Sequence, residues 1–218
     1  MKSSVTTTVI LCSLLAACAT TSPPSSGKYT AVSPTLAQAL RERGVRMLST
    51  PTPDFVRMTN GDQASLTVGV MFGAVGGGIG AAAVIAHTRS AGRAIVAENR
   101  IADPTPRLVE RIREMLATRY ASEDSDSGLT VAVSTDNWAL SKDAVLLDAS
   151  VVITDANTAT RKHPKPLAKG VCHYRSASGD DTHTAEVLLA NGAERLKSEL
   201  DAALDHCTEE FRWKLFPQ

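Results

Sequence analysis

Alternating apolar and polar positions predict three strands in the second half of the chain. Leu129, Val131 and Val133 alternate with small or polar residues, and the alternation is longer between residues 145 and 153 and recurs between residues 168 and 174. A period of two is typical of strands with one covered face. The connectors are short and polar, which favours antiparallel neighbours. We therefore predict a three-stranded antiparallel sheet.

Apolar residues at a helical period predict a helix on either side of these strands. Asp103 and Pro104 form a cap and a first turn. The apolar face that follows is Leu108, Val109, Ile112, Met115, Leu116 and Tyr120. A second, long helix is predicted from Thr184 to Phe216, with apolar positions Leu196, Leu200, Ala203, Leu204, Cys207, Phe211 and Leu215. Residues 101–218 are thus expected to form a two-layer α+β domain.

Shorter elements are predicted over residues 28–63. Ser33, Pro34 and Gly44 supply the cap, first-turn proline and closing glycine of a short helix. Residues 45–49 and 55–59 have the pattern of short strands. Asn60-Gly61 is a strong turn signal.

A glycine-rich apolar segment precedes the α+β domain, and we predict a helix within residues 64–100. No charged residue occurs in the 23 positions from Ala64 to Ala86. On a helix, its small residues would form one stripe at alternating spacings of four and three. These residues are Gly69, Gly73, Gly76, Gly80 and Ala83. The pattern resembles the glycine zippers of small envelope lipoproteins, which commonly carry two such segments where this chain has one.

Three partners for this segment are compatible with the sequence. Each glycine costs a helix about 1 kcal/mol relative to alanine, so the helix requires packing against something else. The partner could be lipid together with another zipper, a second copy of the chain, or the rest of the same domain. Arg89, Arg93 and Arg100 follow the segment and would either meet lipid phosphates or form a solvated face.

The N-terminus has the pattern of a secretory signal. Lys2 is followed by an apolar run up to Leu15 and then by Ala16-Ala17-Cys18. This end resembles the lipobox of bacterial lipoproteins, which implies that residues 1–17 are a signal peptide and that Cys18 carries acyl chains such as palmitate. Residues 18–27 then form a disordered tether. Because Ala19 is not aspartate, the resemblance implies the periplasmic face of the outer membrane.

The balanced charge argues against a nucleic-acid partner, and the cysteine content indicates a disulfide bond. Lys+Arg and Asp+Glu are balanced at 23 each, so no basic field indicates nucleic acid. Once Cys12 and Cys18 are assigned to the signal and the anchor, Cys172 and Cys207 remain. Both point toward the predicted core, and an oxidising compartment favours a disulfide between them, with two buried free thiols as the alternative.

No residue pattern in the chain identifies a catalytic or cofactor site. His173, Asp180, Asp181 and His183 are close enough in sequence to hold a metal, but such residues before a helix more often serve as caps and turns. Gly78-x-Gly80-x-x-Ala83 lacks the preceding strand of a dinucleotide fingerprint. We therefore predict no enzyme activity, no cofactor and no metal. Trp138 and Trp213 would be either buried or exposed anchors for a partner.

These features lead to three functional hypotheses. The first is a non-enzymatic lipoprotein on the periplasmic face of the outer membrane that binds a protein or lipid partner in envelope assembly or maintenance. The second is an oligomeric pore or secretion component in which copies of the glycine-rich segment associate. The third is a periplasmic hydrolase or metal-binding protein using His173 and its neighbours.

Overall fold

The computed structural model describes residues 29–59, 61–62, 78–121, 123–125, 128–155, 165–177 and 184–217. The predicted signal peptide, the tether, Asn60 and most of the glycine-rich segment lie outside these residues. The predicted domain boundaries therefore stay predictions.

Three antiparallel strands form the centre of the fold, as predicted. They are β3 (Leu129–Ser141), β4 (Ala144–Asp155) and β5 (Ala168–Arg175). The two-residue turn of Lys142 and Asp143 joins β3 to β4, which pair from Leu129↔Asp155 to Ser141↔Ala144. The residues that alternate inward, such as Val131, are fully buried.

The prediction of a three-stranded sheet is wrong, because the sheet has five strands. β1 (Val45–Ser49) and β2 (Val56–Met58) both pair in parallel with β3, along the edge that β4 leaves free. β3 has 13 residues, so it is long enough to pair with both in succession. The two short strands were expected, but a parallel partner more than 80 residues away leaves no local signal in the sequence.

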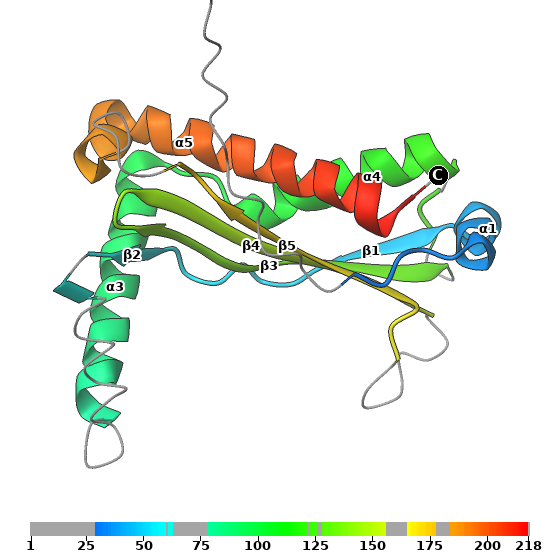
Figure 1. Cartoon of the computed structure of the whole chain (residues 1–218), viewed down its shortest axis with the longest axis horizontal. Coiled ribbons are helices and arrows are strands. Elements are labelled where there is room, and N and C mark those ends of the chain that lie inside the picture. Colours follow the sequence, from blue (N-terminus) through cyan, green and yellow to red (C-terminus); the bar gives the residue numbers. More distant parts are fainter. Residues whose placement is uncertain are drawn as a thin grey trace, which may run out of the picture.

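Two helices cover one face of this sheet (Figure 1). α4 (Pro104–Tyr120) begins at the predicted cap, where the Asp103 carboxylate accepts a hydrogen bond from the backbone N–H of Thr105. All six apolar positions predicted for α4 are buried. α5 (Ala185–Glu210) lies beside α4 and presents its apolar stripe to the same core.

The long C-terminal helix was predicted as continuous, and the structure corrects this in two places. Residues Ala190–Ala193 leave helical geometry, with Asn191 at φ 51° and Gly192 at φ 70°. Asn and Gly are the residues that most readily adopt positive φ, so the break falls where the sequence permits it. At the other end, α5 continues into one turn of π-helix, η2 (Phe211–Leu215).

A disulfide joins the sheet to this helix, as predicted. Cys172 on β5 is bonded to Cys207 on α5, and both residues are fully buried. The bond therefore links the outermost strand of the sheet directly to the helical layer.

The short helix α1 (Pro34–Arg43) is also confirmed. Ser33 caps it through a hydrogen bond from the backbone N–H of Leu36, and Gly44 ends it at φ 70°. A side chain at Gly44 would collide with the backbone oxygen of Glu123, so this position requires glycine on two grounds.

Candidate interaction surface around helix α3

Helix α3 (Gly78–Asn99) stands across one end of the sheet and extends past it on the side away from α4 and α5 (Figure 1). Its contacts with the rest of the fold are concentrated on β2 and on the segment that precedes β2. The part of α3 around Gly92 therefore packs against the domain, and we call it the base. The part from Ala83 to Arg89 projects from the domain, and we call it the shaft.

Gly92 allows the base of α3 to approach the domain closely. A Cβ atom built on Gly92 would lie 1.7 Å from the backbone oxygen of Phe55. No side chain fits in that space, so the close contact exists only because residue 92 is glycine. Phe55 itself is 1% exposed, which makes this contact part of the core.

Trp138 packs against Phe55, the residue that contacts Gly92. Its ring lies 4.9 Å from that of Phe55, and its indole Nε1 donates a 2.6 Å hydrogen bond to the backbone oxygen of Pro53. A small cavity of about 260 Å³ remains here, bordered by Arg93, Val96 and Trp138 among others. Trp138 thus belongs to the core, which is one of the two alternatives left open for it.

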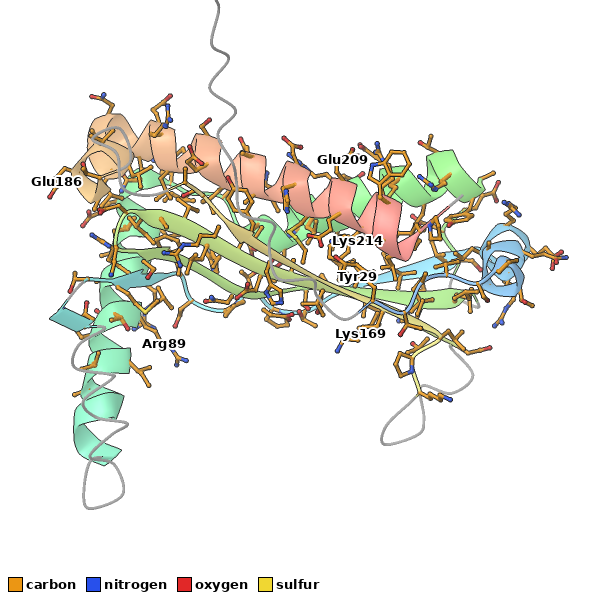
Figure 2. All side chains as sticks on the ribbon, viewed as in Figure 1. Tyr29, Arg89, Lys169, Glu186, Glu209 and Lys214 are labelled. Carbon is orange, nitrogen blue, oxygen red and sulfur yellow. A yellow bond between two sulfur atoms is a disulfide. The ribbon has the colours of Figure 1, made fainter. Side chains whose placement is uncertain are left out.

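The shaft of α3 exposes apolar and cationic side chains. Ala83, Ile85 and Ala86 are exposed, with Ile85 at 42%. Arg89 is exposed one helical turn further on (Figure 2). The predicted small-residue stripe is described only at Gly80 and Ala83, because Gly69, Gly73 and Gly76 lie outside the described residues. Within the part of the chain that is described, no helix combines the length and hydropathy of a membrane span.

The predicted metal-ligand candidate His173 has a different partner. On the sheet face opposite α4 and α5, its Nδ1 lies 2.8 Å from a carboxylate oxygen of Asp148. The other oxygen of Asp148 accepts a 3.1 Å hydrogen bond from the Asn137 side chain. Asp180, Asp181 and His183 lie outside the described residues. Asp148 and Asn137 were not predicted, because the cross-strand register that places them beside His173 comes only from the structure.

Two serines lie near this pair on the same face. The hydroxyl of Ser150 is 2.7 Å from that of Ser134, which in turn donates a hydrogen bond to Asp136. The hydroxyl groups are therefore held by each other and by a carboxylate. Together with the separate hydrogen-bonded group of Asn137, Asp148 and His173, they form a polar surface that crosses three strands.

A broad groove of about 1090 Å³ lies on the helical side, between α1, α4 and the end of α5. Trp213 borders it and is 66% exposed, so of the two tryptophans this one is exposed. The Arg119 guanidinium lies 5.8 Å from the Trp213 ring centre, and Arg41 lies 5.7 Å from the ring centre of Tyr120. Burial raises the pKa of Tyr120, which stays neutral beside these cations.

The first described residues lie along β5 and the end of α5. Thr30 pairs with Lys169, and the backbone N–H of Val32 donates to Leu215. Tyr29 packs against Gly170, and the Lys214 ammonium lies 5.4 Å from the Tyr29 ring centre (Figure 2). Residues 29–32 are therefore attached to the domain at its edge strand.

No protein-family model matches the sequence, and no curated protein matches it. Among solved structures, the chain is similar to a "putative lipoprotein" of Caulobacter crescentus at 16% sequence identity, with a TM-score of 0.23. The similarity covers 47% of this chain and 76% of that one. At this identity and TM-score it transfers neither a fold nor a function.

Proposed function

We propose that this chain is a lipid-anchored protein of the periplasmic face of the outer membrane that binds a protein or lipid partner through helix α3. In this proposal the acylated Cys18 fixes the chain to the bilayer, and the α+β domain presents α3 without performing catalysis. Its role would lie in envelope assembly or maintenance.

The projecting shaft of α3 is the observation that supports this proposal. An isolated apolar side chain on a surface needs no explanation, but the shaft exposes Ala83, Ile85 and Ala86 together at the end of a 23-residue uncharged segment. The tight contact at Gly92 orients the shaft relative to the sheet. A rigidly held apolar helix with Arg89 beside it suits a partner that is apolar and anionic, such as the surface of an anionic bilayer.

A second candidate is self-association, in which copies of the glycine-rich helix pack together as part of a membrane pore or secretion component. The spacing of Gly80 and Ala83 favours it, since small residues at three- and four-residue intervals let two helix backbones approach. Ala83 is exposed and so remains accessible for such a contact.

Substitution of Ile85 tests the proposal with a matched control. Ile85→Gln should reduce flotation of the Cys18→Ala protein with vesicles of phosphatidylethanolamine and phosphatidylglycerol by severalfold, since it removes apolar contact. Leu48→Gln, at a position 41% exposed on β1, should leave flotation unchanged. Both variants should keep the wild-type melting temperature, because both side chains already face solvent.

Light scattering of the same proteins separates the two candidates. A monomer that floats with vesicles supports lipid binding, whereas a defined oligomer that Ile85→Gln dissociates supports self-association. If Ile85→Gln and Leu48→Gln behave alike in flotation and in light scattering, α3 is not the binding surface.

A further inference from the structure

We propose that Cys172, His206, Cys207 and Glu210 form a tetrahedral Zn²⁺ site when the disulfide between the two cysteines is reduced. This inference concerns the junction of β5 and α5 and is independent of the role proposed for α3. It follows from the positions of four possible ligand atoms and from two buried polar atoms without hydrogen-bond partners.

The four residues converge from two elements. Ligand atoms of Cys172, His206 and Glu210 all lie within 4.8 Å of one another. Cys207 is not one of these three mutually close residues, but its sulfur is bonded to that of Cys172 and so supplies the fourth ligand of the proposed site. On α5, positions 206, 207 and 210 lie within about one helical turn, and Cys172 approaches them from β5 with its Cα 5.5 Å from that of Cys207.

Two of these ligand atoms are buried and lack a hydrogen bond. Nε2 of His206 and Oε2 of Glu210 make no hydrogen bond within normal geometry among the described residues, although they face each other at 3.5 Å. The Tyr29 phenol also lies near Glu210, and burial together with the Glu210 carboxylate raises the pKa of Tyr29. The Glu210 side chain is only 8% exposed. Buried polar atoms are rarely left unsatisfied, and each one costs about 1–3 kcal/mol. A cation bound between these two atoms would satisfy both.

Neighbouring side chains hold the two ligands in orientation. The Lys214 ammonium donates a 2.5 Å hydrogen bond to Oε1 of Glu210, which leaves Oε2 available. The Tyr174 ring packs on the His206 imidazole with ring centres 5.5 Å apart. Metal-binding side chains in proteins are commonly fixed by such outer contacts. Lys214 is 44% exposed, so solvent screens the repulsion between its charge and a nearby cation.

The donor set fits zinc once the sulfurs are thiolates. A dithiol reductant transfers two electrons and two protons to the disulfide, which becomes two thiols while the reductant forms its own disulfide. Zinc binding then releases the two thiol protons. With Zn–S bonds of about 2.3 Å, tetrahedral geometry separates the two sulfurs by about 3.8 Å, which needs only a small displacement of β5 from α5. The metal would thus replace the covalent link between strand and helix.

Zinc titration of the reduced full-length mature protein tests this site. After reduction with a phosphine, the wild type should bind one Zn²⁺ per chain, and Co²⁺ should show thiolate charge-transfer absorption. His206→Ala and Glu210→Gln should each weaken Zn²⁺ binding at least tenfold. His173→Ala and Glu209→Gln, which change exposed residues outside the cluster, should bind as the wild type does.

The oxidised proteins provide the control for folding. Each variant should have the circular dichroism spectrum of the wild type before reduction, and oxidised wild type should bind no Zn²⁺ at this site. Zn²⁺ should also slow re-formation of the disulfide in the reduced wild type but not in His206→Ala. The proposal is wrong if the reduced wild type takes up no stoichiometric Zn²⁺, or if His206→Ala and Glu210→Gln retain its affinity and its Co²⁺ spectrum.

Discussion

Contacts of single residues fix the position of α3 and stabilise the edge of the sheet. At the base of α3, the absence of a side chain at Gly92 brings the helix backbone against that of Phe55. Next to the disulfide, the phenol of Tyr174 is held in its neutral form by its surroundings. Each contact leads to a prediction that a single substitution can test.

Gly92→Ala should destabilise the protein by about 2 kcal/mol or more, because the new methyl group has to displace the backbone of Phe55. Urea unfolding measures the loss, and in a Trp213→Phe background the fluorescence of Trp138, whose ring is 4.9 Å from that of Phe55, reports the local shift. Gly61→Ala is the control, since its nearest heavy atom would be 3.7 Å away. Equal stability of the two variants would show that α3 is not held at Gly92.

Tyr174 should make the protein sensitive to alkali. Burial, followed by the charge of Glu199 and a hydrogen bond to it, raises the pKa of Tyr174 to about 12 from an ordinary value of 10.0. Below pH 10 the phenol is protonated in both the folded and the unfolded state, so its full contribution to the free energy of unfolding is present. Between pH 10 and 12 the unfolded chain ionises first, and stability falls as pH rises.

Melting temperatures measured from pH 9 to 12 test this effect. Tyr174→Phe cannot ionise, so its melting temperature should decline less steeply over this range than that of the wild type. Parallel declines would show that the Tyr174 phenol does not titrate differently in the folded and unfolded states.

At the scale of elements, the strands and helices follow local sequence patterns, whereas their partners do not. The caps at Ser33 and Asp103 were enough to predict α1 and α4, and the alternation along β3, β4 and β5 was enough to predict three strands. The parallel pairing of β1 and β2 with β3 was missed, because it depends on residues far apart in the chain. The Asp148–His173 contact was missed for the same reason, since it requires the β4–β5 register.

The break in α5 had a local sequence signal, but the helical period of the apolar residues led to the prediction of one continuous helix. Asn191-Gly192 is a strong turn dipeptide, but the apolar residues before and after it are compatible with one helical stripe. The exposure of Trp213 also had a local signal, although both burial and exposure were left open for it. Trp213 lies between Arg212 and Lys214 and off the predicted apolar stripe that includes Phe211 and Leu215, and it is 66% exposed.

The link between β5 and α5 predicts a large effect of reduction. Cys172 and Cys207 are 35 residues apart, so breaking their bond should lower the free energy of unfolding by about 3–4 kcal/mol on the chain-entropy model. Urea unfolding of oxidised and phosphine-reduced protein, both in the presence of a chelator, measures the difference. A difference below about 1 kcal/mol would mean that packing alone holds the strand to the helix.

At the scale of the whole molecule, the parts are arranged around one sheet. α4 and α5 cover one face, the polar surface that contains Asp148 and His173 lies on the other, and α3 projects at one end (Figure 1). The chain enters the domain along β5 at Tyr29. If Cys18 is acylated, the residues between it and Tyr29 reach at most about 36 Å at 3.3 Å per residue, which keeps the domain close to the bilayer.

Intact-mass spectrometry of the mature protein, purified from membranes in detergent, tests this account most directly. The account predicts a chain that begins at Cys18 and carries the added mass of several acyl groups, and a Cys18→Ala variant without them. A mature wild-type chain that lacks acyl groups would contradict the lipid anchor and, with it, a function at the membrane surface.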